Sequence, residues 1–202
     1  MIEQINYFFF SMINATPASS PWMISFATFI ARDLIMIIPI SLVGLWLWGP
    51  KNTMDSQRTL VIKTAIALAF SMLSAACIGM LIPHDRPFVV GFGYNFMSHA
   101  PDSSFPSNHG TAIFTFALAF VFWHKLWSAI SMMIIAAAIA WSRIYLGVHW
   151  PLDMVGGFLL GIVGCLFAQL VWNLFGEAIS DGLKRIYYVI FALPIRRGWV
   201  RS

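Results

Sequence analysis

The sequence has few charged residues: Asp, Glu, Lys and Arg make up 10% of the 202 residues, against roughly 25% in soluble domains. Hydrophobic residues make up 59% of the chain, and its mean hydropathy is +0.79. This composition excludes an ordinary soluble globular protein. We therefore expect an integral membrane protein.

Cysteine and carboxylate side chains are also scarce. The two cysteines, Cys77 and Cys165, lie in apolar segments and are interpreted as packing residues rather than a disulfide or metal site. The eight Asp and Glu residues form no cluster of the kind that holds Mg²⁺, so we expect no metal and no cofactor. The net charge is +4, and most of the basic residues lie between or after apolar runs. This pattern is typical of membrane topology and not of a nucleic-acid surface.

The apolar runs predict an all-α transmembrane bundle of about five spans. These cover approximately residues 22–48, 60–82, 107–123, 126–144 and 154–175. Two apolar pieces, 2–14 and 186–195, are too short to cross a hydrocarbon core of about 30 Å and are predicted to lie in the interface. The whole chain, 1–202, then forms a single membrane-embedded domain.

Basic residues predict the orientation of the bundle. Nine of the twelve fall in segments on one side if Lys63 is counted with its loop, and this bias marks the cytoplasmic side. The other three are Arg32, Arg86 and Arg143. The N-terminus is then outside, and four of the five histidines lie on the outer side with two of these arginines.

Between the last two predicted spans the chain carries Arg143, His149 and Asp153. Ionisable groups at the edge of a span are costly unless they are paired or in use. Pro151 is tolerated in the first turn of a helix, so a helix is predicted to begin near Trp150 with Asp153 in that turn. The carboxylate can then fix the imidazole tautomer and leave the other ring nitrogen as nucleophile or base. The alternative interpretation is a His and an Asp that cap a helix at the interface.

The long polar loop before the third span brings further residues to the same face. The residues expected to gather there are Arg86, Ser107, His109, Arg143, His149 and Asp153. Two guanidiniums, a hydroxyl and a helix N-terminus suit a phosphate anion. Two histidines allow one to attack phosphorus while the other protonates the leaving oxygen. His99, Asp85 and Asp102 are interpreted as ordinary loop residues.

The spacing of these residues resembles the three-part signature of the type 2 phosphatidic acid phosphatase superfamily. The parts are Arg86-Pro87, then Pro106-Ser107-Asn108-His109, then Ser142-Arg143 followed by His149 and Asp153, all within residues 79–153. The small size and the segment Pro83-His84-Asp85-Arg86-Pro87-Phe88 are most similar to bacterial undecaprenyl-diphosphate phosphatases of the bacitracin-resistance type, especially the enterobacterial ones.

This resemblance implies a function and a set of roles. The implied roles are His149 as nucleophile, Asp153 as its orienting partner, His109 as general acid, and Arg86, Ser107 and Arg143 as phosphate ligands. The implied reaction hydrolyses undecaprenyl diphosphate through a phosphohistidine, at the periplasmic face of a bacterial inner membrane. It would recycle the carrier lipid for peptidoglycan synthesis and confer bacitracin resistance. The implied partners are the polyprenyl diphosphate and the bilayer, without nucleic acid, and no sequence feature specifies an oligomeric state.

Two positions depart from the family pattern. Gly79 stands where the family has Lys, and Asn108 stands where it usually has Gly. The missing Lys removes one positive charge from the site, and His84 or Arg32 is a candidate to replace part of its contact. Asn108 suits a helix start and is a further candidate at the phosphate. The other interpretation of Arg32 is an ion pair with the adjacent Asp33, turned toward the bundle interior.

Other functions stay open on sequence grounds. A phosphotransferase would pass the phosphoryl group from His149 to another lipid, and a phosphatase of phosphatidylglycerol phosphate or phosphatidic acid would use the same residues. A transporter or channel would account for charges within a span, but not for two arginines and two histidines on one face. A vanadate-dependent haloperoxidase has a similar anion site, but such proteins are soluble.

Overall fold

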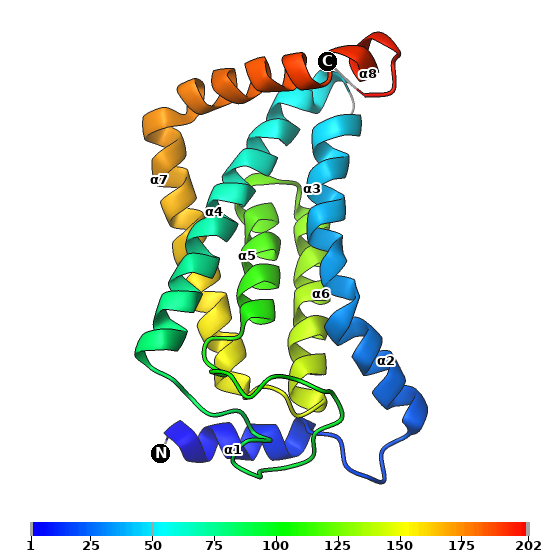
Figure 1. The fold of residues 1–202 in the computed structure, drawn as a ribbon, viewed down its shortest axis with the longest axis vertical. Coiled ribbons are helices and arrows are strands. Elements are labelled where there is room, and N and C mark those ends of the chain that lie inside the picture. The colour runs from blue at the N-terminus through cyan, green and yellow to red at the C-terminus, as the bar shows by residue number, and fades with distance from the viewer. Residues whose placement is uncertain (1, 50, 201–202) are drawn as a thin grey trace.

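The computed structural model describes residues 2–49 and 51–200, without the side chains of residues 2 and 51. The regular elements of this part of the chain are helices. They are α1 (Ile2–Ile13), α2 (Pro21–Arg32), α3 (Ile37–Trp48), α4 (Met54–Leu81), α5 (Asn108–Trp123), α6 (Leu126–Tyr145), α7 (Pro151–Ile190) and α8 (Ala192–Arg196), with 3-10 turns at Leu34–Met36 and Lys51–Thr53. Figure 1 shows α2 to α7 running along the bundle, α1 across one end, and the last part of α7 with α8 across the other.

Length and composition confirm a membrane bundle. Four helical stretches are long and apolar enough to cross a membrane, namely Pro21–Trp48, Met54–Leu81, Leu126–Tyr145 and Pro151–Ile190. The apolar helix α5 is shorter, with 16 residues. The five predicted spans therefore correspond to four long stretches and one short central helix.

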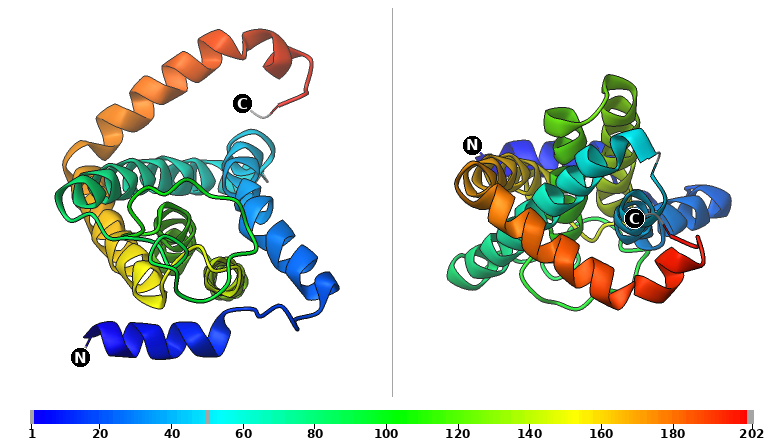
Figure 2. Two further views of the ribbon diagram at one scale, coloured as in Figure 1. Left: turned by 60° about the horizontal axis from the view of Figure 1, so that its bottom comes forward. Right: turned by 90° about the horizontal axis from the view of Figure 1, so that it is seen from above.

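Helix α5 lies in the middle of the bundle and contacts α4, α6 and α7. The stretch from Thr115 to Phe120 is buried on all sides, which explains why its sequence is apolar all round. At 1.5 Å per residue it is about 24 Å long, which is less than a hydrocarbon core of about 30 Å. The chain from 82 to 107 folds over the N-terminus of this short helix, and Figure 2 (left) shows it passing around the ends of α5 and α6.

Small residues allow α5 and α7 to approach closely. A Cβ atom added at Gly157 would lie 2.6 Å from the backbone nitrogen of Thr111, and one at Gly161 would lie 2.9 Å from that of Thr115. Helices in a bilayer associate through such backbone packing, because lipid offers no hydrophobic driving force between them. This contact fixes the N-terminus of α5 relative to that of α7.

The first predicted span is broken rather than continuous. It bends after α2 at Asp33, and a 3-10 turn joins α2 to α3. Arg32 Nε lies 3.0 Å from Asp33 Oδ1, so the predicted ion pair is present, but the two side chains are 69% and 41% exposed. They do not face the bundle interior. The buried side of α2 is formed by Ala27 and Ala31, and Arg32 falls about 100° away from Ala31 around the helix.

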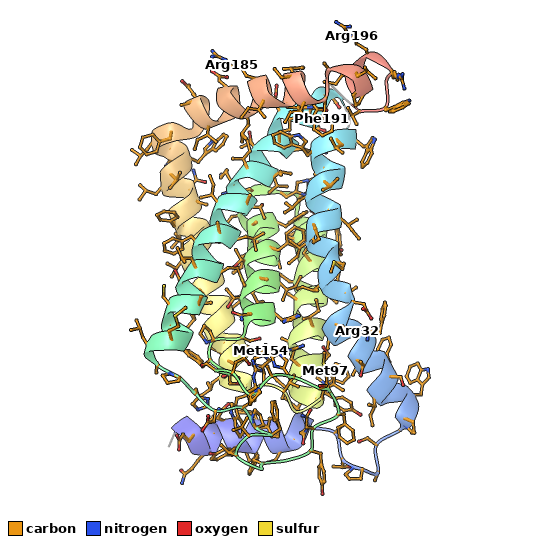
Figure 3. The ribbon with its side chains drawn as sticks, viewed as in Figure 1. Arg32, Met97, Met154, Arg185, Phe191 and Arg196 are labelled. Atoms are coloured by element: carbon orange, nitrogen blue, oxygen red, sulfur yellow. The ribbon has the colours of Figure 1, made fainter. Side chains whose placement is uncertain are left out.

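The C-terminal segment is helical and runs across the end of the bundle, as expected for an interfacial helix, but this part of the helix begins earlier than predicted. Helix α7 continues beyond the fifth predicted span, turns sharply in its orange part and runs across the end of the bundle (Figure 1). Lys184 Nζ forms an ion pair with Asp55 Oδ1 at 2.9 Å, and the Arg58 guanidinium lies 4.6 Å from the Tyr187 ring centre. Arg185 and Arg196 lie at this end (Figure 3). Arg201, which was counted with the same basic segments, lies outside the described residues.

Helix α1 is the predicted N-terminal interfacial helix, and it covers the opposite end of the bundle (Figure 1). Phe10 is fully buried and its ring centre lies 5.0 Å from that of Trp150. The side-chain oxygen of Asn6 accepts a hydrogen bond from the Leu152 amide at 3.1 Å, and so satisfies a free N–H of the first turn of α7. Phe8 is 61% exposed, as expected for an apolar side chain that meets lipid.

Replacing Gly157 with Ala should weaken the bundle. The new methyl group would collide with the backbone of α5, and such overpacking costs about 1–3 kcal/mol. The matched control is Gly182→Ala on the same helix, where an added Cβ meets no atom within 4 Å. Thermal unfolding in detergent should show a lower midpoint for Gly157→Ala and an unchanged or higher one for Gly182→Ala. Equal midpoints for the two variants would contradict the close packing.

Candidate active site

Arg86 is a buried guanidinium that joins two loops. It is 2% exposed, and its Nη2 pairs with Asp102 Oδ1 at 2.8 Å while its Nη1 donates to the Val148 carbonyl at 2.9 Å. Nη1 also lies 3.0 Å from Nε2 of His149. The loop before α5 and the loop between α6 and α7 therefore meet at one cation.

The contacts of His149 assign its tautomer. Arg86 can only donate, so Nε2 of His149 accepts and the ring proton is assigned to Nδ1. Nδ1 lies 3.2 Å from Oδ2 of Asp153, as the spacing of these two residues predicted. Burial, helped by Arg143 and Arg86, lowers the pKa of the His149 imidazole to about 4, although Asp153 opposes this change. At neutral pH the ring is therefore uncharged, and the unprotonated Nε2 carries a lone pair that accepts from Arg86.

Asp153 collects three donors on one carboxylate oxygen. Oδ2 accepts from the Trp150 backbone N–H at 2.8 Å, from the hydroxyl of Ser104 and from His149 Nδ1. The N-cap of α7 is Trp150 and Pro151 is its first residue, as predicted. Ser104 is fully buried and its Oγ also lies 3.3 Å from His149 Nδ1. Ser104 was not predicted as a site residue, although it stands two positions before the motif that begins at Pro106.

Arg143 is the second buried guanidinium of the site. It is 1% exposed, in the last turn of α6. Its Nη1 contacts the sulfur of Met97 at 3.8 Å, while Nε and Nη2 have no hydrogen-bond partner. Figure 3 shows Met97 and Met154 at the end of the bundle near α1. Buried donors without partners are costly, and an anion with several oxygens would satisfy them.

The N-terminus of α5 supplies Ser107, Asn108 and His109. The Ser107 hydroxyl accepts from the Gly110 amide at 3.2 Å, so this residue is the N-cap, and its own amide donates to the Asp153 carbonyl. Asn108 is exposed and His109 is partly buried. His109 lies within electrostatic range of both guanidiniums and of His149. The structure thus brings together the set of residues that the sequence predicted.

Two loop residues that the sequence analysis set aside belong to this cluster. Asp102 is the ion-pair partner of Arg86, and the ring centre of His99 lies 6.0 Å from that of His149. The interpretation of Asp102 and His99 as ordinary loop residues is therefore corrected. Loops have no periodicity to indicate where a side chain points, and the signal available was their position between Arg86 and the second motif.

Three other positions lie outside the cluster of guanidiniums. Arg32 is paired with Asp33 on the exposed side of α2 (Figure 3). His84 lines a separate cavity of about 270 Å³ together with Trp150 and residues of α1. Gly79 faces Ser103, where an added Cβ would make ordinary van der Waals contact at 3.8 Å. Arg32 therefore lies away from the bundle interior, while the His84 amide donates to the hydroxyl of the same Ser103 at 3.2 Å and its ring faces the cavity beside α1.

The arrangement combines a neutral imidazole nucleophile with two buried cations and a second histidine. Such a site can hold a phosphoryl group, attack it and protonate a leaving oxygen. In the part of the chain described, no three His, Cys, Asp or Glu side chains are grouped as metal ligands.

Comparison with known proteins identifies the family. The model of the PAP2 superfamily matches residues 59–177, which include the cluster from Arg86 to Asp153. The chain belongs to the PAP2 superfamily. It is thus an enzyme of the membrane phosphatase type that the resemblance implied, and the all-helical bundle agrees with this family.

Individual relatives extend this result over the whole chain. "Putative undecaprenyl-diphosphatase YbjG" of Escherichia coli (strain K12) is 59% identical over 202 residues, which is 100% of both chains. "Undecaprenyl-diphosphatase BcrC" of Bacillus subtilis (strain 168) is 28% identical over 189 residues, 92% of this chain and 93% of the relative. Among solved structures, LpxE of Aquifex aeolicus has a TM-score of 0.68 at 23% identity, covering 82% of this chain and 94% of that one. The last comparison supports the PAP2 fold alone.

Replacing Ser104 with Ala should slow the enzyme and change its pH dependence. A hydrogen bond to a charged group contributes about 1.5–3 kcal/mol, so we expect kcat to fall by about tenfold to a hundredfold. Without the hydroxyl, the Asp153 carboxylate stabilises a protonated His149 more strongly. The pKa of His149 should then rise, and the acid limb of kcat/KM should move from near pH 4 to higher pH. Ser104→Thr, which keeps the hydroxyl, should restore the original limb; an unshifted limb in Ser104→Ala would contradict this role.

Arg32→Ala and His84→Ala should each leave kcat/KM within about twofold of the wild type, because neither side chain contacts the guanidinium cluster. Surface ion pairs such as Arg32 with Asp33 contribute about 0–1 kcal/mol to stability. Phosphate release by the purified variants is the measurement. A fall of tenfold or more in either variant, with unchanged thermal stability, would show that it reaches the substrate after all.

Proposed function

We propose that this protein hydrolyses undecaprenyl diphosphate to undecaprenyl phosphate and inorganic phosphate through a phosphohistidine on His149. The observation that carries the proposal is the neutral Nε2 of His149 beside Arg86, with the unpaired donors of Arg143 in the same cluster. The names of the relatives from E. coli and B. subtilis support the substrate.

The proposed reaction has two steps. In the first, the His149 Nε2 lone pair attacks the terminal phosphorus, the bond from phosphorus to the bridging oxygen breaks, and His109 gives its proton to the departing lipid phosphate. In the second, water attacks the phosphohistidine, His109 takes the proton from water, and inorganic phosphate leaves while Nε2 recovers its lone pair. Arg86, Arg143 and the free N–H groups at the start of α5 stabilise the charge on the phosphoryl oxygens.

The roles of the remaining residues follow from their contacts. Asp153 holds the Nδ1 proton of His149 and so keeps the reactive nitrogen deprotonated. Ser107 acts mainly by capping α5, and its neighbour Asn108 is placed to contact a phosphate oxygen from the exposed side. The basic residues at the opposite end of the bundle support a cytoplasmic location for that end. The active site would then face the periplasm of a bacterial inner membrane, where it recycles the carrier lipid for peptidoglycan synthesis and confers bacitracin resistance.

The decisive measurement is phosphate release from undecaprenyl diphosphate by detergent-purified protein, with and without EDTA and beside phosphatidic acid. We expect chelator-resistant release, with undecaprenyl diphosphate as the better substrate. His149→Ala should lower the rate by at least about 10⁴-fold while the protein stays monodisperse with an unchanged unfolding midpoint.

Three results would contradict the proposed function. A His149→Ala variant with near-wild-type release would refute the nucleophile. A wild-type protein that is inactive with water, but forms a new phosphorylated lipid when an acceptor lipid is added, would indicate a phosphotransferase. Faster release from phosphatidic acid would indicate a phosphatase of other lipid phosphates.

A further inference from the structure

His99 lies beside the proposed nucleophile, and the two-step reaction above gives it no role. Its ring stands nearly perpendicular to that of His149, with the ring centres 6.0 Å apart. Its side chain is 21% exposed, whereas that of His149 is 2% exposed. His99 therefore lies at the partly open edge of the cluster, beside the ring of the proposed nucleophile.

The ring of His99 is held from one side. Its Nδ1 lies 3.0 Å from the carbonyl oxygen of Ala100, which can only accept, so the proton is assigned to Nδ1. The same nitrogen lies 3.6 Å from Oδ1 of Asp102, the carboxylate that also pairs with Arg86. Asp102 thus links His99 to one of the phosphate-binding guanidiniums. Nε2 of His99 makes no hydrogen bond to the described chain and remains available to a ligand.

The electrostatic surroundings of His99 make its charge depend on what is bound. The titratable or charged groups that act on it are Arg86, Arg143, Asp102 and His109. Burial and the two arginines lower the pKa of His99, although Ala100 and Asp102 oppose this change. A bound anion would partly neutralise the arginines and favour protonation of Nε2, which then becomes a hydrogen-bond donor.

We propose that His99 binds the second phosphate of a diphosphate substrate and so makes the enzyme prefer lipid diphosphates to lipid monophosphates. This inference rests on the proposed function. The two arginines, the α5 N-terminus, His149 and His109 suffice for one phosphoryl group. A diphosphate carries a second charged group one bridging oxygen away, and His99, whose ring centre lies 6.0 Å from that of His149, is proposed to donate to it. A monophosphate ester places only a neutral glycerol or prenyl carbon there.

The test compares two substrates in two histidine variants. Purified wild type, His99→Gln and a control, His124→Gln, are assayed with a polyprenyl diphosphate and with phosphatidic acid. The control histidine lies between α5 and α6 at the other end of the bundle, so its replacement should change neither rate. For His99→Gln we expect kcat/KM to fall by about tenfold with the diphosphate, the effect of one charge-assisted hydrogen bond, and by less than about twofold with phosphatidic acid. Inhibition by inorganic pyrophosphate should weaken in the same variant, while inhibition by inorganic phosphate should not.

Three results would overturn the inference, and they separate it from the proposed function. If the wild type prefers the diphosphate and His99→Gln lowers both rates by the same factor, His99 serves catalysis or structure in general and the inference alone fails. If His99→Gln keeps the wild-type rates with both substrates, the inference about His99 also fails, while the proposed function stands. If the wild type releases phosphate only from phosphatidic acid, both the proposed function and the inference fail. An unfolding midpoint equal to that of the wild type confirms that the variant is intact.

Discussion

One carboxylate oxygen, Oδ2 of Asp153, holds the catalytic end of the molecule together. Its donors come from three places in the chain: the turn at Trp150, the long loop at Ser104 and the imidazole of His149. The backbone carbonyl of Asp153 also accepts from the Ser107 amide, and so ties α7 to the cap of α5. A buried carboxylate is tolerated only with such partners, so the positions of His149, Ser104 and the N-terminus of α5 depend on this one residue.

Unpaired backbone and charged groups are costly at membrane depth, so the polar groups of this loop need partners within the protein. The fold meets this demand by placing the irregular chain between 82 and 107 at the end of a short central helix, covered by α1. Arg86 shows the result: its donors are used by the carbonyls of Val148, Asp102 and Ser103 as well as by the Asp102 carboxylate. The loop is therefore ordered by the same cation that is proposed to bind the phosphate.

The sequence was sufficient to predict the helical class, the five apolar runs and a group of polar residues that the fold brings together at one end of the bundle. Proline at 151 and the four-residue spacing of His149 and Asp153 predicted local geometry that depends only on helix periodicity. The bend at Asp33 and the continuation of α7 across the end of the bundle were not predicted, because the polar residues after Phe175 resemble a loop when hydropathy alone is considered. They form a helix because their backbone stays hydrogen-bonded while Lys184 and Tyr187 contact residues of α4.

The contacts missed by sequence analysis share a physical cause. Ser104, Asp102 and His99 act across sequence separations that no local pattern encodes, since Ser104 meets Asp153 49 positions away. A further contact that no local pattern encodes is made at Gly147, whose positive φ of 79° turns the chain after α6 while the absence of a side chain admits the carbonyl of Tyr94. Asn14 links the long loop to the end of α6, because its side-chain amide donates to the carbonyls of Tyr94 and Tyr145.

Helix α1 contacts the start of α7, which carries Asp153, and also presents apolar side chains on its exposed face. Asn6 caps the helix that begins with Asp153, and Phe10 packs on Trp150, whose indole N–H donates to the carbonyl next to Arg86. A lipid substrate must keep its tail in the bilayer while its phosphates reach the short helix α5. Under the proposed function, α1 would set the depth of the site relative to the headgroups through these contacts and would so orient an amphipathic substrate toward His149.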